Sequence, residues 1–414
     1  MNTQEIQQIL KKYNIDAWFL YDFRHSNHIA WKTLGLSPES HCTRRWAVVI
    51  PAEGEPVKIV NGIELHSLKD VQAREVSYSS RIEWQNVITD VLKPFKTIAL
   101  EYSPNGDLPT ISKVDAGTVE FLRTLGKELV SSADIAQHFD AVWTPQQLKE
   151  NLKTAKALRK SMMDAFTFIR EMHKMERSFT EYDVQMHIQE VFKMNGIVSS
   201  YPPTVAVGKN AANAHYSPTK EVNAAIVAGD VVLIDMWAKT EEKDSVYADI
   251  TWMGYVGSEV PPRVAELFNI IADARDAAVA LVKDRFAKGE KLYGYEVDDA
   301  ARHVIEKAGY GKYFIHRTGH NIAEEIHGPG ANMDNFETHD TRRIIPMTSF
   351  SIEPGIYIPD EIGLRTEIDV IIDENGGVLI PTAPIQDKVI ALLGDNDFIT
   401  VEKKDEQINT SQKE

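Results

Sequence analysis

The chain has 414 residues, 43% of them hydrophobic, and a formal net charge of −16 at pH 7. This length favours two or three domains with sizeable cores, and the charge argues against general nucleic-acid binding, which depends on clustered lysine and arginine. The single cysteine, Cys42, excludes an intramolecular disulfide framework and a cysteine-rich zinc module. Because no apolar run suits a signal core or a membrane span, we expect a cytoplasmic protein without membrane partners.

The first 140 residues alternate short apolar runs with helix-like segments. The runs IDAWFLYD, WAVVIP, VKIV and TIALEYS are typical of strands, whereas ISKVDAGTVEFLRTLGK is typical of a helix. We therefore expect a small N-terminal α/β domain over residues 1–141.

A long helix is expected after Pro145, where apolar residues recur at spacings of three and four. Further helical segments alternate with strands, which predicts a second domain over residues 142–400 with its strand pairs grouped toward the C-terminal half. The predicted fold class is therefore α+β. The polar residues 401–414 are expected to form a flexible tail.

Two pairs of acids lie inside apolar, strand-like runs of the second domain. Asp235 and Asp249 are fourteen positions apart, and so are Glu353 and Glu367. If each pair flanks a hairpin centred on TEEKD or PDEIG, its two acids lie directly opposite, with Cβ atoms roughly 5 Å apart. The alternative is that each acid faces solvent, but a carboxylate buried in such a run needs hydrogen bonds or a cation. Four such acids favour a metal centre.

The segment FIHRTGHNIAEEIHGPG contains His316, His320 and His327, three of the thirteen histidines. Imidazole with carboxylates suits Mn, Fe, Co or Zn, and one histidine with four acids suits two metal ions better than one tetrahedral zinc. The other two histidines are then available for substrate contacts and proton chemistry, or for a supporting role.

The order Asp, Asp, His, Glu, Glu and the segments LIDMWA, ADIT, HRTGH, SIEPGIYI and GLRTEID resemble the pita-bread metallopeptidases of family M24. This family includes methionine aminopeptidase, aminopeptidase P and prolidase, and the N-terminal domain favours the Xaa-Pro branch. The resemblance implies a C-terminal pita-bread catalytic domain, a homodimer, and two divalent ions bridged by Asp249 and Glu367. Manganese is expected, with cobalt, zinc or iron as alternatives. The five implied ligands are Asp235, Asp249, His320, Glu353 and Glu367.

The stretch SSYPPTVAVGKNAANAHY resembles a family segment that contacts substrate. It implies that His215 lies beside the substrate and takes part in catalysis, and that Tyr201 lines the proline pocket. His316 and His327 match the family's two non-ligand active-site histidines, which implies substrate binding and catalysis. Arg365 is expected to support Glu367 and to contribute to substrate binding.

The implied function is that of a metallo-exopeptidase that hydrolyses the Xaa-Pro bond of dipeptides or of peptide N-termini. Glu353 would carry a proton toward the leaving nitrogen, and His316 and His327 would stabilise the oxyanion. The adjacent Arg342 and Arg343 are candidates for binding the free carboxylate that a dipeptidase must recognise. The alternatives are a metal-dependent amidohydrolase of a small non-peptide amide and a non-catalytic binding module on the same fold.

Two features depart from the family pattern. The loop between the two aspartates is longer than usual, and Trp237 and Trp252 stand where glycine and arginine are common. We expect Trp237 to fill a gap in the core.

Overall fold

The structure, a computed structural model, describes residues 2–394, and the chain divides into two compact units, Met1–Val142 and Trp143–Glu414. The tail predicted over residues 401–414 lies outside the described residues. Within the described part, no helix is both long and apolar enough to cross a membrane.

The N-terminal unit is built on a six-stranded sheet with the order β4-β3-β2-β1-β5-β6. Strand β2 runs antiparallel to β1 and β3, and the other neighbouring pairs are parallel. The strands are β1 (Ala17–Asp22), β2 (Trp46–Pro51), β3 (Val57–Asn61), β4 (Arg74–Tyr78), β5 (Thr97–Leu100) and β6 (Glu128–Ser131).

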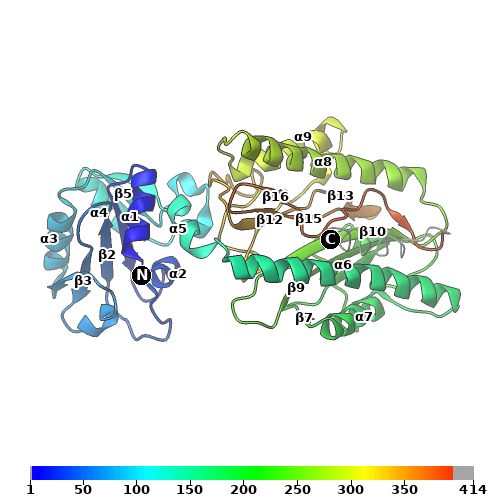
Figure 1. The fold of residues 1–414 in the computed structure, drawn as a ribbon, viewed down its shortest axis with the longest axis horizontal. Coiled ribbons are helices and arrows are strands. Elements are labelled where there is room, and N and C mark those ends of the chain that lie inside the picture. Colours follow the sequence, from blue (N-terminus) through cyan, green and yellow to red (C-terminus); the bar gives the residue numbers. More distant parts are fainter. Residues whose placement is uncertain (1, 395–414) are drawn as a thin grey trace, which may run out of the picture. The chain divides into compact units, whose positions relative to one another are not determined.

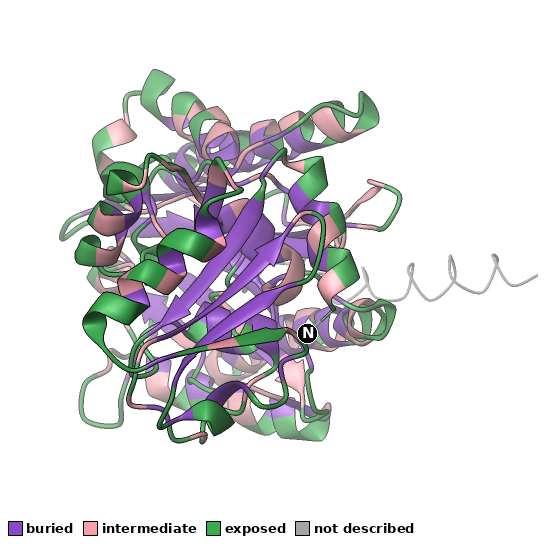
Figure 2. Ribbon diagram, turned by 90° about the vertical axis from the view of Figure 1, so that its left-hand side faces the viewer, coloured by how far each residue is buried: buried purple, intermediate pink, exposed green. Residues whose placement is uncertain are grey.

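Helices cover both faces of this sheet, because side chains of the central strands alternate between two apolar clusters. In β1, Trp18 and Leu20 face α1, α2 and α5, whereas Phe19 and Tyr21 face α3 and α4. Figure 2 shows the central strands buried and the outer helix faces exposed. The helices are α1 (Thr3–Lys12), α2 (His28–Leu34), α3 (Arg81–Leu92), α4 (Ala116–Thr124) and α5 (Ala133–Asp140). The predicted N-terminal α/β fold is confirmed.

The C-terminal unit encloses its strands between two pairs of helices (Figure 1). A capping box formed by Thr144 and Gln147 starts α6 (Pro145–Lys174), and Thr180 with Asp183 starts α7 (Glu181–Met194) in the same way. These helices pack on the hairpin of β9 (Val231–Thr240) and β10 (Ala248–Tyr255). The other pair, α8 (Pro262–Ala287) and α9 (Gly294–Lys307), packs on the C-terminal strands.

The remaining short elements complete the sheets and connections of both units. β7 (Ile197–Val198), β8 (Thr204–Val207) and β17 (Ile390–Ala391) extend the β9–β10 sheet. A second sheet has the order β11-β12-β15-β16, formed by Asn321–Ile322, Thr348–Ile352, Ile368–Ile372 and Val378–Leu379, and β13 (Gly355–Ile358) pairs with β14 (Ile362–Arg365). Single 3₁₀ turns are η1 (Leu65–Leu68), η2 (Pro104–Gly106), η3 (Pro109–Ile111), η4 (Gly208–Asn210) and η5 (Gly311–Tyr313).

One long hairpin is interrupted where the site forms. The pairs Ile352↔Ile368 and Gly355↔Arg365 keep a single register, so β12–β13 and β14–β15 are two halves of one hairpin. At the interruption, the Glu353 N–H donates to the Thr318 carbonyl at 2.7 Å, and the Glu367 N–H donates to the Thr251 carbonyl at 3.1 Å. The gap in the ladder therefore brings two distant segments to these glutamates.

Candidate metal centre

Strand alternation places both aspartates on the inner face of the β9–β10 hairpin. Their neighbours Ile234, Met236 and Ile250 belong to the apolar cluster under α6 and α7, so Asp235 and Asp249 point the other way, toward the second sheet. Asp249 is 3% exposed.

The prediction that Asp235 and Asp249 lie directly opposite each other is wrong. Asp235 pairs with Thr251, and Asp249 pairs with Trp237, so the aspartates are diagonal neighbours. The ladder is symmetric about Lys243 rather than about Glu242, which shifts the register by two residues and leaves the face unchanged.

The glutamate pair has the predicted geometry. The register on either side of the interruption places Glu353 opposite Glu367. Glu367 is 2% exposed, and its Oε2 accepts a hydrogen bond from the Thr251 hydroxyl at 2.6 Å. Glu353 lies closer to solvent, and the Ser351 hydroxyl donates to its Oε1 at 3.0 Å.

His320 is held by its backbone against β12. Gly319 permits this approach, because a Cβ there would lie 1.9 Å from the Ser351 carbonyl oxygen. The His320 Nδ1 lies 3.2 Å from the carbonyl oxygen of Asn321, and since a carbonyl only accepts, Nδ1 carries the proton. Nε2 therefore presents a lone pair, 3.4 Å from Glu353 Oε1 and 3.7 Å from Asp249 Oδ2.

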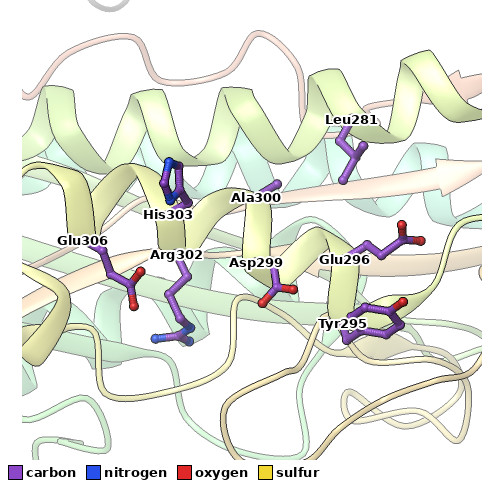
Figure 3. A pocket seen from close by; sticks show the side chains of 8 residues that line it. All are labelled: Leu281, Tyr295, Glu296, Asp299, Ala300, Arg302, His303 and Glu306. Carbon is purple, nitrogen blue, oxygen red and sulfur yellow. The ribbon is translucent and has the colours of Figure 1, made fainter.

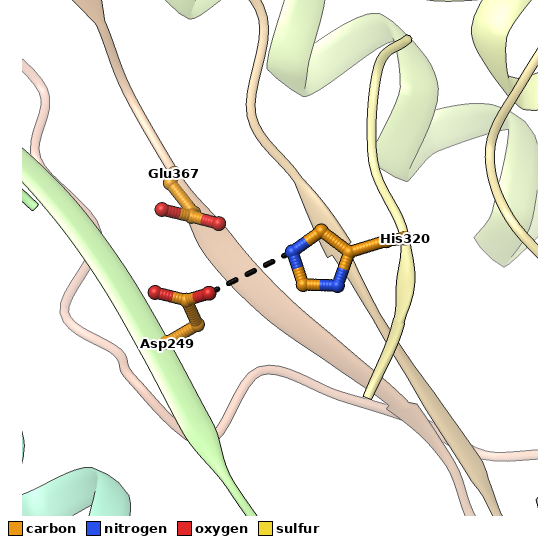
Figure 4. Close-up of side chains that lie close together, drawn as sticks. All are labelled: Asp249, His320 and Glu367. Atoms are coloured by element: carbon orange, nitrogen blue, oxygen red, sulfur yellow. Dashed lines mark ion pairs between the residues drawn. The ribbon is translucent and has the colours of Figure 1, made fainter. Parts of the chain in front are cut away.

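Figure 4 shows Asp249, Glu367 and His320 pointing toward one another from β10, the residue directly before β15 and the segment before β11. One ligand atom from each lies within 4.8 Å of the others. Asp235 and Glu353 adjoin this inner trio through Arg365, which forms an ion pair with Asp235 and lies 3.9 Å from Glu353. The structure thus brings together all five predicted ligands.

The protonation equilibria of the cluster show that it needs positive charge. Burial and the neighbouring acids raise the pKa of Asp249 and of Glu367 well above their usual values. Burial also raises the pKa of Glu353 to about 7 and lowers that of His320. Asp249 Oδ1 is buried without a hydrogen-bond partner. A divalent cation would satisfy these oxygens and the His320 lone pair, so the residues fit a metal centre of carboxylate and imidazole ligands.

Arg365 is buried among the ligands, with its guanidinium already engaged. It donates to Asp235, to the Tyr357 hydroxyl at 2.9 Å and to the Thr251 hydroxyl at 3.3 Å. Its ion pairs are therefore with Asp235 and Glu353, not with Glu367 as expected. This supporting position argues against the predicted contact between Arg365 and substrate.

His316 is also committed to the protein. Its Nδ1 lies 2.7 Å from the Arg317 carbonyl oxygen, and its Nε2 lies 2.9 Å from the Tyr357 hydroxyl. Nδ1 must donate, so Nε2 accepts from Tyr357, and burial keeps the ring neutral by lowering its pKa to about 3. With both nitrogens occupied, His316 positions its neighbours, in contrast to the predicted substrate contact.

The remaining predicted substrate residues are exposed to solvent. His327 is exposed, and its ring packs edge-on against His320 with centroids 4.5 Å apart. His215 is exposed, and its charge lowers the pKa of His327, a smaller effect than burial and Arg317. Tyr201 is 66% exposed. His327 and His215 therefore mark the exposed side of the centre.

A buried carboxylate holds the segment that contains His215. Glu181, at the start of α7, accepts hydrogen bonds from the Tyr216 hydroxyl at 2.5 Å and from the side chain of Asn210 at 3.1 Å. It also accepts from the Val207 N–H at 2.7 Å. The motif residues Asn210 and Tyr216 therefore fix the loop rather than contact substrate.

Sequence reasoning missed four supporting residues, Thr251, Ser351, Tyr357 and Asp369. Asp369 accepts the Asp249 N–H at 2.9 Å. Its position two residues after Glu367 was a usable signal, because strand alternation puts i and i+2 on one face. Ser351, two residues before Glu353, offered the same signal. The Thr251 hydroxyl binds Glu367 and the Tyr357 hydroxyl binds His316, and these partners are distant in sequence.

A separate hollow on α9 is lined by Glu296, Asp299, His303 and Glu306, among others (Figure 3). It contains none of the five predicted ligands, and two of its acids have partners: Arg285 binds Glu296 and Asn335 binds Asp299.

Trp237 packs with Trp143 and Tyr247, which agrees with its predicted core role.

Comparisons with known proteins agree with this geometry. Residues 150–374 match the model of metallopeptidase family M24. An Xaa-Pro dipeptidase of Pyrococcus furiosus is 28% identical over 290 residues, 70% of this chain and 74% of that protein. A Mycoplasma genitalium protein, provisionally named Xaa-Pro aminopeptidase, is 30% identical over 247 residues, which are 59% of this chain but only 63% of the relative. The crystal structure of dipeptidase PepE from Mycobacterium ulcerans has a TM-score of 0.62 at 22% identity and covers 94% of this chain and 96% of that one. The predicted α+β, pita-bread fold is confirmed.

Proposed function

Because the chain belongs to metallopeptidase family M24, we propose that it is a metallo-exopeptidase that hydrolyses Xaa-Pro bonds in dipeptides or at peptide N-termini. The observation that carries the proposal is the unprotonated Nε2 of His320, which faces the oxygens of two carboxylates. Two lone pairs at this distance repel unless a cation or a proton lies between them, and a divalent cation can serve both carboxylates at once. The names of the relatives support the substrate class.

The proposed ligands of two divalent ions are Asp235, Asp249, His320, Glu353 and Glu367. Asp249 and Glu367, the two least exposed of the four acids, are the proposed bridging ligands. Manganese suits this oxygen-rich set with one imidazole, and cobalt, zinc and iron are alternatives. When bound, such ions would supply an activated water for attack and would polarise the scissile carbonyl.

Glu353 is the proposed proton carrier. It lies at the solvent side of the cluster, where it can reach both the inner ligands and a substrate. The Ser351 hydroxyl fixes one of its oxygens, so the carboxylate is oriented before substrate binds. Proton transfer from Glu353 to the leaving proline nitrogen would complete cleavage.

His327 and His215 are the proposed groups that contact the peptide carbonyl. Both are exposed on the open side of the centre, and a ring donor there would stabilise the developing oxyanion. Tyr201 is the proposed wall of the proline pocket, since an exposed ring can pack on the fixed pyrrolidine ring.

We also propose a homodimer, from the family resemblance, and a cytoplasmic location, which the buried thiol of Cys42 suits.

The test measures bound metal and hydrolysis of Ala-Pro after reconstitution with manganese. We expect about two ions per chain, proline release, and at least a 1000-fold loss of kcat in Glu353→Ala, because that change removes a ligand and the proton carrier. Glu361→Ala, at an exposed acid in the β13–β14 turn, is the matched control and should leave both readings unchanged. Less than one ion per chain, or full activity in Glu353→Ala, would refute the proposal.

A further inference from the structure

We propose that a hollow in the N-terminal unit binds a small molecule that carries a phosphate group. The hollow has a volume of about 550 Å³ and is lined by residues from the ends of β1, β3 and β4 and from the start of α3. We call it the arginine hollow, after Arg44, Arg45 and Arg81 in its lining. It contains none of the five proposed metal ligands, so the inference goes beyond the proposed hydrolase activity and does not rest on it.

The charge of the arginine hollow suits a phosphate group. The single acid in its lining is Asp115, so three guanidinium groups and one carboxylate give a formal charge of +2. A phosphate monoester carries a charge of about −1.5 to −2 at pH 7, which this lining would balance. Guanidinium groups also match the geometry of phosphate oxygens, because each can donate two parallel hydrogen bonds.

The guanidinium groups of the three arginines have only neutral partners. Arg44 donates to a hydroxyl at 2.7 Å, Arg81 donates to a side-chain amide oxygen at 3.2 Å, and Arg45 lies 5.3 Å from the centre of an indole ring. These partners are Thr43, Gln85 and Trp84, in that order. None of the three arginines forms an ion pair with a residue that the structure describes, so each has donors to offer an anion.

The acids near the arginine hollow are satisfied by other donors. Asp115 caps α4, where it accepts the Thr118 N–H at 2.9 Å and the Thr118 hydroxyl at 2.8 Å. Glu64 and Glu83 do not line the hollow, and they accept backbone N–H groups of residues 43–44 and 79–80. Since Glu83 already caps the start of α3, the arginines rather than the helix dipole would attract the ligand.

Arginines of the C-terminal unit are engaged in a way that the three are not. Arg365 binds Asp235, and Arg302 binds Asp298. Arg342, which the sequence suggested for a substrate carboxylate, is 4% exposed and is held by Asp340 at 2.9 Å and by a backbone carbonyl at 2.6 Å. This engagement argues against the predicted role of Arg342. A buried arginine that already has a carboxylate partner has little left to bind a second anion.

The arginine hollow also lies where open α/β sheets bind their ligands. β1, β3 and β4 run in the same direction, and Tyr21, Asn61 and Tyr78 lie at or next to their carboxyl ends. Ligands of such sheets bind in the crevice outside these ends. The size agrees as well, because small-molecule sites enclose roughly 300–1,000 Å³.

Aromatic rings give the arginine hollow an apolar side for the organic part of the ligand. Tyr21 and Tyr78 are buried in its wall, whereas the Phe23 ring is 43% exposed. The Tyr78 hydroxyl donates to the Arg45 carbonyl oxygen at 2.7 Å, which fixes the backbone that carries this arginine. A ligand with a phosphate on the arginines and a flat ring against Phe23 would use both sides of the hollow.

The experiment titrates the manganese-loaded full chain with three probes in a calorimeter. Phenyl phosphate has both a ring and a phosphate, phenol has only the ring, and inorganic phosphate has only the anion. We expect phenyl phosphate to bind with a dissociation constant below about 1 mM. Inorganic phosphate should bind more weakly, and phenol should not bind.

Substitutions then locate the binding. Arg44→Gln and Arg81→Gln should each weaken phenyl phosphate binding about 10-fold or more, because each removes a charged hydrogen-bond donor at an exposed position. Arg81→Lys should recover part of the loss, since it keeps the charge but not the paired donors. Arg74→Gln is the matched control: Arg74 is also exposed but starts β4, at the opposite end of the strand from Tyr78, and should bind as the unsubstituted protein does.

Three outcomes would overturn the inference: no binding of phenyl phosphate, equal affinity for phenol, or equal affinity in Arg81→Gln and Arg74→Gln. The last would show that phosphate binds elsewhere, for example at the metal centre. Thermal unfolding of each variant checks that it is folded. Ala-Pro hydrolysis is measured separately, so its absence would refute the proposed function and leave this test unchanged.

Discussion

Glu101, directly after β5 of the N-terminal unit, and Asp249, in β10 of the C-terminal unit, are both enclosed acids beside apolar residues, but their surroundings differ. Glu101 is fully buried and accepts hydrogen bonds from Trp18 at 2.7 Å, from Asn27 at 2.6 Å and from Ser132 at 2.9 Å. Burial raises its pKa, and these three donors oppose the increase. Both oxygens therefore have partners, and no metal is needed.

Asp249 has the opposite surroundings. Its Oδ1 has no partner, and after burial the largest influences on its pKa are the charges of Asp235, Asp369 and Glu353, which raise it. Burial of an acid alone is thus no sign of a metal. Clustering of acids around an unsatisfied oxygen and an imidazole lone pair is the sign, because one cation can satisfy the oxygen, the lone pair and the clustered charges together.

The largest effect expected from this difference is on metal binding. Asp249→Asn should lose at least one bound ion and lower kcat/KM for Ala-Pro about 1000-fold or more, because a proposed bridging carboxylate becomes a weak amide ligand. Glu101→Gln should retain full metal content and nearly full activity. Mass spectrometry measures the metal content, and proline release measures the activity. Equal metal loss in the two variants would contradict the proposed difference between Asp249 and Glu101.

A second expectation concerns where metal stabilises the chain. Ligand at 100 times its dissociation constant stabilises the folded state by about 2.7 kcal/mol. Hydrogen exchange should therefore slow in peptides containing Asp249, His320 and Glu367 after manganese is added. Peptides around Glu101 should exchange at unchanged rates. Equal protection in both regions would show that the ions act outside the proposed cluster.

The sequence pattern alone could not separate these two kinds of acid. TIALEYS places Glu101 at the end of an apolar run, much as VVLIDMW places Asp235 within one. What distinguished the metal acids was their pairing in hairpins, the nearby histidines and the family resemblance. The Glu353 and Glu367 register followed from a short turn, whereas the longer loop after β9 let the ladder shift by two residues.

Apolar runs and capping residues similarly located β1, β2, β5 and α6, because these signals are local in sequence. The roles of His316 and Arg365 depend on Tyr357 and Asp235, which are far from them in sequence or on another strand. No local spacing encodes those contacts. The expected substrate roles of His316 and Arg365 therefore did not match their hydrogen bonding.

A third expectation is that removal of the Glu101 charge and removal of the Asp249 charge have opposite effects on the stability of the metal-free protein. Glu101→Gln should destabilise the chain by about 1–3 kcal/mol. The substitution replaces one of the two carboxylate oxygens with an NH2 group, which cannot accept the hydrogen bonds that this oxygen receives. Asp249→Asn should stabilise the metal-free protein by about 1 kcal/mol, because it relieves repulsion among the clustered acids. Urea denaturation in the presence of a chelator gives both values, and destabilisation of similar size in both variants would contradict the contrast.

The smallest effect on stability is expected at Asp140. This enclosed acid lacks the full set of hydrogen-bond donors that Glu101 has, and it is not clustered with other acids as Asp249 is. Its Oδ1 is buried without a hydrogen bond, and Lys32 Nζ lies 3.6 Å away. Burial raises its pKa from 3.8 to about 6, so between these values the folded state holds a proton that the unfolded state has released. Stability from this group is therefore fully present below pH 3.8 and is lost as pH rises through 6.

Asp140→Asn should remove this pH-dependent loss of stability and raise the free energy of unfolding by about 1 kcal/mol at pH 7.5. Near pH 3.5 it should have no stabilising effect. Loss of the ion pair with Lys32 reduces the stabilisation at pH 7.5. His138, whose pKa burial lowers to about 4, produces the opposite trend between pH 4 and 6.5, so the raw stability curve hides the effect. The difference between the variant and the unsubstituted protein at each pH cancels the His138 contribution. A difference that does not change with pH would mean that Asp140 stays ionised when folded, and that an enclosed acid can persist without donors or a metal.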